Sequence, residues 1–154
     1  MFTSTQEVAD FISEQNIELV DVRFCDVPGV QQHFTIPVSE FLDAALSDGL
    51  MFDGSSVRGF TAIHESDMKL IPDISSAFVD PFRDRKTLVV NFSIVDPFTD
   101  EPFSRDPRQV AAKAEAYLRS TGIADECFIG AEAEFYLFDD VRYQVTPHNT
   151  FFSV

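Results

Sequence analysis

The sequence predicts an α+β fold, in which helices and strands follow one another without a repeated βαβ unit. Two patterns support this fold class. Residues 4–16 and 106–122 carry helix caps around an apolar stripe of helical period. Residues 19–25, 30–36 and 87–95 are rich in β-branched and aromatic residues, several of them alternating with polar ones. We therefore expect one sheet covered by a few short helices.

The first predicted element is a short helix near the N-terminus. Ser4 and Glu7 have the spacing of a capping box, in which a hydroxyl and a carboxylate satisfy free amides of the first turn. Val8 and Ile12 then lie on one helical face, and Asn16 is suited to end the helix. This stripe predicts a helix with one face against the core.

A hairpin and a second helix are expected next. Residues 19–25 and 30–36 are predicted to be strands, and residues 26–29, with the sequence Asp-Val-Pro-Gly, carry a turn signal between them. Ser39 is suited to cap a helix that Gly49 ends. The chain is thus expected to begin as helix, hairpin, helix.

The middle of the chain is predicted to hold a loop and two strands. Residues 51–60 break all periodicity and contain closely spaced Gly and Ser, so they are expected to form a loop. Residues 68–71 and 87–95 are predicted strands, separated by a connector that contains Pro and Asp. The turn-rich residues 96–105 are expected to mark a domain boundary.

The last third is predicted to begin with a helix and to continue as a strand. Asp106 as N-cap, Pro107 at the first helical position and Gly122 after the last turn predict the helix. Residues 128–138 are apolar enough to predict a buried strand. No further element is expected in residues 139–154, whose two adjacent Phe at the end suggest interior sequence cut short.

Charge and composition exclude several classes of protein. With 26 acidic and 11 basic residues the formal net charge is −15, which repels nucleic-acid backbones and anionic membranes. No run of about 18 apolar residues occurs, and the start does not resemble a signal peptide. Cys25 and Cys127 lack the spacing of a zinc or redox motif. We expect a soluble, cytoplasmic protein with free thiols and with no nucleic-acid or membrane partner.

Glu132 and Glu134 form the first candidate site. Residues two apart in a strand point to the same face, roughly 6 to 7 Å apart, so both carboxylates would project side by side. In an apolar strand such a pair needs a cation, protonation or solvent, and hard oxygen ligands suit Mg²⁺ or Mn²⁺. Spacing alone favours the simpler alternative, a solvated acidic face of an edge strand. Two ligands would in any case leave a metal site incomplete.

Asp53 is the second candidate, at the start of the Gly- and Ser-rich loop. Such a loop can present a carboxylate or amides to a ligand, although the pattern alone favours the simpler interpretation, a turn of small residues. It lacks the GK[ST] ending of a phosphate-binding P-loop. Asp67 is read as a strand-start or cap carboxylate, and the three histidines, which form no metal-binding motif, as ordinary surface or core residues.

Three stretches in this order resemble glutamine synthetase of bacterial type I, and residues 58–60 and 104–107 resemble its actinobacterial members. The three stretches are residues 21–26 with 32–37 (DVRFCD and QHFTIP), residues 51–56 with 65–68 (MFDGSS and ESDM), and residues 130–135 (GAEAEF). The resemblance covers nearly the whole chain but only the first third of the family's length. It implies a β-grasp-like N-terminal domain over residues 1–103, followed by the truncated start of the catalytic α/β domain over residues 104–154.

The resemblance also implies a function: ATP-dependent formation of glutamine from glutamate and ammonium through γ-glutamyl phosphate, in a homo-oligomer that is a dodecamer in the family. Glu134 would bind the Mg²⁺ or Mn²⁺ ion nearer glutamate, and Glu132 the ion nearer ATP. Asp53 matches the acid that binds ammonium and takes its proton. Phe60, where some relatives carry Trp, and Asp67 match positions near the substrate and the subunit boundary. The remaining metal ligands and arginines lie in the missing part, so this chain is expected to be inactive alone.

Two other functions stay open at this point. The chain could be a non-catalytic β-grasp module that assembles with, or regulates, full-length subunits. It could also be an acidic metal-binding domain of an unrelated family, with its own cation at Glu132 and Glu134.

Overall fold

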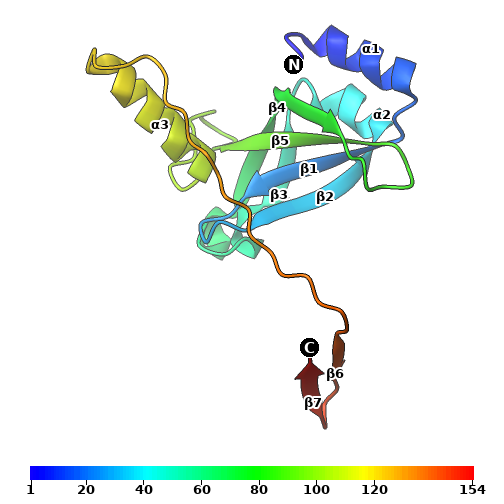
Figure 1. Ribbon diagram of the computed structural model, residues 1–154. Helices are drawn as coiled ribbons and strands as arrows, with labels where there is room; N and C mark the ends of the chain where they lie inside the picture. The colour runs from blue at the N-terminus through cyan, green and yellow to red at the C-terminus, as the bar shows by residue number, and fades with distance from the viewer.

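A five-stranded sheet forms the body of the molecule in the computed structural model, which describes all 154 residues (Figure 1). The helical elements are α1 (Thr5–Gln15), α2 (Val38–Glu40) continued by the π-helical turn Phe41–Ala45, the 3₁₀ turns Gly54–Ser56 and Ile63–Glu65, and α3 (Pro107–Ser120). The strands are β1 (Leu19–Cys25), β2 (Gln31–Pro37), β3 (Leu50–Asp53), β4 (Asp67–Val79), β5 (Thr87–Val95), β6 (Arg142–Val145) and β7 (Thr150–Ser153).

The sheet has the strand order β2-β1-β5-β4-β3. Its two central neighbours, β1 and β5, run parallel, and every other pair is antiparallel. β6 and β7 pair only with each other and form a separate hairpin (Figure 1). This mixed sheet with its short helices confirms the predicted α+β class. None of the helices has the length and apolar character needed to cross a membrane.

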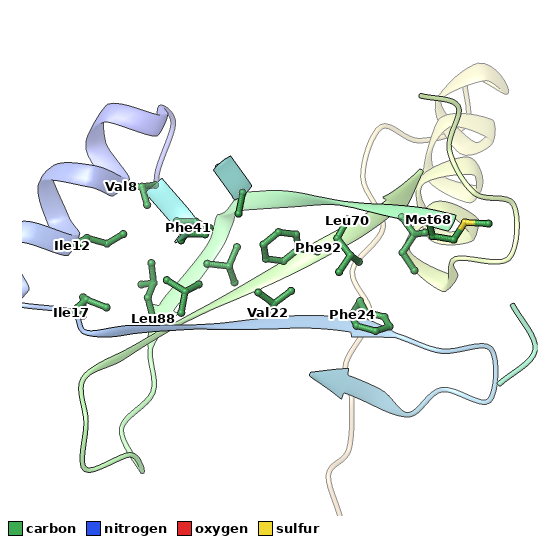
Figure 2. Packing of buried hydrophobic residues seen from close by; sticks show 14 of the residues in the cluster. Val8, Ile12, Ile17, Val22, Phe24, Phe41, Met68, Leu70, Leu88 and Phe92 are labelled. Atoms are coloured by element: carbon green, nitrogen blue, oxygen red, sulfur yellow. The ribbon is translucent and has the colours of Figure 1, made fainter. Parts of the chain in front are cut away.

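One face of the sheet carries the hydrophobic core. Val8 and Ile12 of α1 and Phe41 of the π-helical turn point toward Leu88 of β5 (Figure 2). The rest of the cluster comes from the same elements, from β1, from β4, from the loop after β3 and from Ile17 between α1 and β1. Every fully buried apolar residue lies between Val8 and Val95, so the sheet and its helices form a closed core without residues 107–154.

The predicted helix boundaries at α1 and α3 are confirmed. The Ser4 hydroxyl accepts from the Glu7 amide, and Asn16 ends α1 in the left-handed conformation with φ of 53°. Asp106 caps α3, where its carboxylate accepts from the amides of Arg108 and Ile94, both at 2.9 Å. The Ile94 contact ties the start of α3 to β5. Strands β1 and β5 also have the predicted bounds.

Three predictions between β2 and β5 were wrong. Ser39 lies inside α2, which begins after Pro37 with no side-chain cap. The segment predicted as a loop begins with β3, a strand too short to show alternation. β4 continues through the predicted connector to Val79. β3 pairs with β4 only as far as Leu70, so beyond that residue the outer edge of β4 has no partner strand. Pro72 lies in this open part, where its lack of an amide hydrogen leaves no hydrogen bond unformed.

Two predictions for the last third were also wrong. Residues 128–138 form no strand and are exposed, because no other strand offers them hydrogen-bond partners. Residues 142–153, where no element was expected, form the β6–β7 hairpin. Its turn is closed by a bond from the Thr146 amide to the Asn149 carbonyl at 2.9 Å.

Gly49 gives a test of how β3 is held against β4. Its φ is +83°, and a Cβ there would lie 2.5 Å from the Leu70 carbonyl oxygen. We expect Gly49→Ala to lower the free energy of unfolding by roughly 2 to 4 kcal/mol, from left-handed strain and this clash together. The matched control is Gly29→Ala, with φ of +92° and open space around the added carbon. It should cost only about 1 to 2 kcal/mol. Urea unfolding would measure both, and equal losses would contradict the packing argument.

Candidate functional site

Asp53 and Asp67 lie opposite each other at the end of the β3–β4 pair. The antiparallel register makes them cross-strand neighbours, and both are exposed. Like charges directly opposite are unfavourable unless other groups stabilise them. The structure therefore brings two of the predicted site residues to one edge of the sheet.

The carboxylate of Asp53 is oriented by the loop that follows it. Its Oδ1 accepts from the amide of Ser55 at 2.9 Å and from the hydroxyl of Ser55 at 2.6 Å, and its Oδ2 accepts from the hydroxyl of Ser56 at 2.6 Å. These bonds, chiefly that from the Ser55 hydroxyl, hold the pKa of Asp53 below its ordinary value. Asp53 is thus an exposed carboxylate that stays charged and has a fixed orientation.

The segment after Asp53, residues 54–66, is called the Asp53 loop here. Its ends are joined by a bond from the Gly54 amide to the Ser66 carbonyl at 2.6 Å. Phe60 at its apex is 1% exposed, and its ring meets that of Phe103 edge-on with centroids 5.3 Å apart. Phe60 therefore packs in the interior of this chain and supports the loop from within.

A cleft of about 720 Å³ opens between the Asp53 loop and the connector from β5 to α3. Its walls include His64 and Asp67 on one side and Asp96 and Arg105 on the other. Acidic and basic groups both line it. The residue that sequence reasoning missed here is Arg105, because its contacts lie about 45 residues away along the chain.

Glu132 and Glu134 are placed differently. Both are exposed, on a segment with neither helix nor strand. Neither carboxylate has a hydrogen-bond or ion-pair partner, and no group of three metal-ligating side chains is assembled anywhere in the chain. Their oxygens are of the type that Mg²⁺ and Mn²⁺ prefer, but the chain supplies two ligands where a complete protein site needs more.

A second polar cluster covers the other face of β1. Asp21 is fully buried, and it pairs with Nε of Arg23 at 2.7 Å and lies 2.9 Å from Nδ1 of His33. Thr35 donates to it at 3.0 Å, and Arg83 lies at 3.4 Å. Burial alone would raise the pKa of Asp21, but the bonds from Arg23, His33 and Thr35 outweigh burial and lower it. The cluster fixes the β1–β2 pair to the turn after β4.

Sequence comparison matches the chain to two domain profiles in series. The profile of the glutamine synthetase beta-Grasp domain matches residues 16–97, and that of the glutamine synthetase catalytic domain matches residues 104–154. Proteins named glutamine synthetase from Frankia alni and Mycolicibacterium smegmatis are each 58% identical, over 97% and 98% of this chain. The one from Streptomyces coelicolor is 57% identical over the whole chain. The chain spans about a third, 32%, of the length of these relatives.

Structure comparison gives the same fold. A cryo-EM structure of Plasmodium falciparum glutamine synthetase superimposes with a TM-score of 0.76 over 98% of this chain and 29% of that one, at 21% sequence identity. A structure titled GmaS/ADP complex superimposes with a TM-score of 0.65 over 73% of this chain, at 23% identity. At these identities the likeness concerns the fold alone.

The pKa of Asp53 provides a test of the loop geometry. We expect Ser55→Ala to raise it toward the ordinary aspartate value, because the variant loses the hydroxyl bond that contributes most. Ser56→Ala should raise it by less. Carboxyl-carbon NMR titration of the chain measures the shift. Asp73 is the internal control, since Ser75 holds it in the same way and neither variant touches it. An Asp53 titration unchanged in both variants would contradict the geometry.

Metal binding by the isolated chain is a second test. We expect wild-type chain and the Glu132→Ala, Glu134→Ala double variant to give the same Mn²⁺ calorimetry trace at micromolar concentrations, because two unoriented carboxylates do not make a tight site. Tight binding that disappears in the double variant would show an independent site and would support the reading as a separate metal-binding domain.

Proposed function

This chain belongs to the glutamine synthetase family, and from that premise we propose that it supplies the N-terminal part of a glutamate-ammonia ligase. The observation that carries the proposal is the serial match of both domain profiles together with relatives up to 58% identical. We take residues 1–103 as the β-grasp-like domain and residues 104–154 as the start of the catalytic domain. The enzyme would be a cytoplasmic homo-oligomer, and the resemblance to the family implies a dodecamer.

In the proposed reaction the γ-carboxylate of glutamate attacks the γ-phosphoryl group of ATP, which gives γ-glutamyl phosphate and ADP. Ammonium then gives up a proton to the Asp53 carboxylate, which passes it on to solvent, and the ammonia formed attacks the acyl carbon and displaces phosphate. Asp53 is the residue of this chain proposed to hold the ammonium ion. Its exposed, oriented and charged carboxylate supports that role.

The lowered pKa of Asp53 bears on the two parts of that role. A carboxylate that stays ionised binds a cation well but is a weaker base. Asp53 is therefore better suited to hold the ammonium ion than to keep its proton. Asp67, opposite Asp53 in the register, adds negative charge at the same edge and supports a cationic substrate there.

Glu132 and Glu134 would contribute to the metal sites, Glu134 to the ion nearer glutamate and Glu132 to the ion nearer ATP. Bound Mg²⁺ or Mn²⁺ would neutralise the triphosphate during phosphoryl transfer. The carboxylate chemistry fits these ions. The two residues of this chain would then complete their sites only together with ligands that lie outside residues 1–154.

A second function is supported by the closed core between Val8 and Val95. A β-grasp unit that buries its own core could act without catalysis, as a module that docks on full-length subunits. Size-exclusion chromatography of this chain mixed with an intact relative tests the idea. Co-migration would support the module, and separate elution would exclude it.

The catalytic proposal is tested by comparing the chain with a chimaera in which it replaces the matching 32% of the Streptomyces coelicolor relative. We expect phosphate release that depends jointly on ATP, glutamate and ammonium from the chimaera and none from the chain alone. In the chimaera, Asp53→Asn should raise the KM for ammonium at least about tenfold, since a charged contact is lost. Turnover by the isolated chain, or an unchanged ammonium KM, would contradict the proposal.

A further inference from the structure

Arg105 lies on the connector between β5 and α3 and reaches across to the Asp53 loop. Its Nη1 donates to the carbonyl oxygen of Gly59 at 3.2 Å and also to that of Phe60. Its neighbour Arg108 pairs with Asp73, whereas Arg105 forms no ion pair. The guanidinium of Arg105 thus donates hydrogen bonds to two successive backbone carbonyls, which form the apex of the Asp53 loop.

The same apex is held on two other sides. Phe103, two residues before Arg105, contacts Phe60 edge to face. On the far side Gly59, with φ of +84°, lies so close to the turn between β1 and β2 that a Cβ would be 3.1 Å from Cβ of Val27. The apex therefore fits between that turn and the connector, and Arg105 fastens it from the exposed side of the connector.

Fixing the apex also fixes the groups that orient Asp53. The Ser55 and Ser56 donors belong to the first turn of the Asp53 loop. That turn continues to the apex through bonds from the Val57 amide to the Gly54 carbonyl and from the Phe60 amide to the Val57 carbonyl, at 3.1 and 3.2 Å. A loop freed at its apex would sample more conformations, and both serines would spend less time on the carboxylate.

We propose that Arg105 is a positioning residue, which holds the Asp53 loop by its apex so that the Asp53 carboxylate keeps one orientation toward a cationic substrate. The inference rests on the proposed role of Asp53 in binding ammonium. Arg105 itself touches no reacting atom. Its backbone contacts give it a role that neither its charge nor its place in the sequence indicates.

Hydrogen exchange on the 154-residue chain tests the contact directly. Arg105→Met keeps the length of the side chain and removes its donors, and because Arg105 is exposed the variant should fold. We expect amides of the Asp53 loop, among them Gly54, Val57 and Phe60, to exchange at least about tenfold faster, and those of β1 and β5 to be unchanged. Arg105→Lys, which can still donate, should recover part of the protection.

The matched control is Arg119→Met, because Arg119 also donates to a backbone carbonyl, that of Asp125, but on α3. It should leave exchange in the Asp53 loop unchanged. In the same Arg105→Met chain the pKa of Asp53 should rise, while that of Asp73 should stay constant. Unchanged exchange in the loop, or equal acceleration in β1 and β5, would overturn the proposal, since the second result means a loss of global stability only.

The chimaeric enzyme separates this inference from the proposed function. Arg105→Met should raise the KM for ammonium several-fold and leave the KM for ATP unchanged, with partial rescue by Arg105→Lys. If Asp53→Asn raises the ammonium KM and Arg105→Met does not, only the role of Arg105 fails. If Asp53→Asn has no effect on the ammonium KM, the proposed role of Asp53 fails, whatever hydrogen exchange shows of the loop.

Discussion

The parallel pairing of β1 with β5 is the interaction on which the rest of this structure depends. The two strands are adjacent in space although more than 60 residues separate their paired positions, such as Val20 and Leu88. β2 adds to one side of the pair and β4 to the other, and the helices cover the core face. Because pairing of distant strands pays a large loop-closure cost, it needs dense burial. β5 supplies it, with Leu88, Val90 and Phe92 fully buried.

The position of the candidate site follows from that central pair. The turn after β1, the loop between β3 and β4, and the connector after β5 all leave the sheet at the same end. Val27, Gly59 and Arg105 come from these three segments and meet there. Asp53 ends β3 at this edge, so its backbone is set by the sheet and its carboxylate by the loop. The sheet thus provides a rigid base, and the loop orients the candidate carboxylate.

Local signals in the sequence predicted the elements that local chemistry determines. Caps at Ser4 and Asp106 placed α1 and α3, and β-branched runs placed β1 and β5. The length of β4 was missed because a proline such as Pro72 usually ends a strand. Pro72 is tolerated inside β4 because β3 pairs with β4 only as far as Leu70. The strand predicted at residues 128–138 was wrong because a strand exists only with a partner. The Asp21–His33 cluster could have been found from the sequence by aligning the two strands of the predicted hairpin residue by residue. The contacts of Arg105 are non-local and leave no signal in the sequence.

The two candidate groups of carboxylates differ in how far the chain has already ordered them. Asp53 is held by three hydrogen bonds on a folded sheet, so a cation that binds it meets a carboxylate with little freedom left to lose. Glu132 and Glu134 lie on an exposed segment that nothing orients. An ion bound there must also offset the entropy of ordering that segment, which couples metal binding to structure formation. In the proposed enzyme, therefore, the ammonium-binding group is preorganised within this chain, while the metal ligands gain their geometry only as the rest of the site assembles around them.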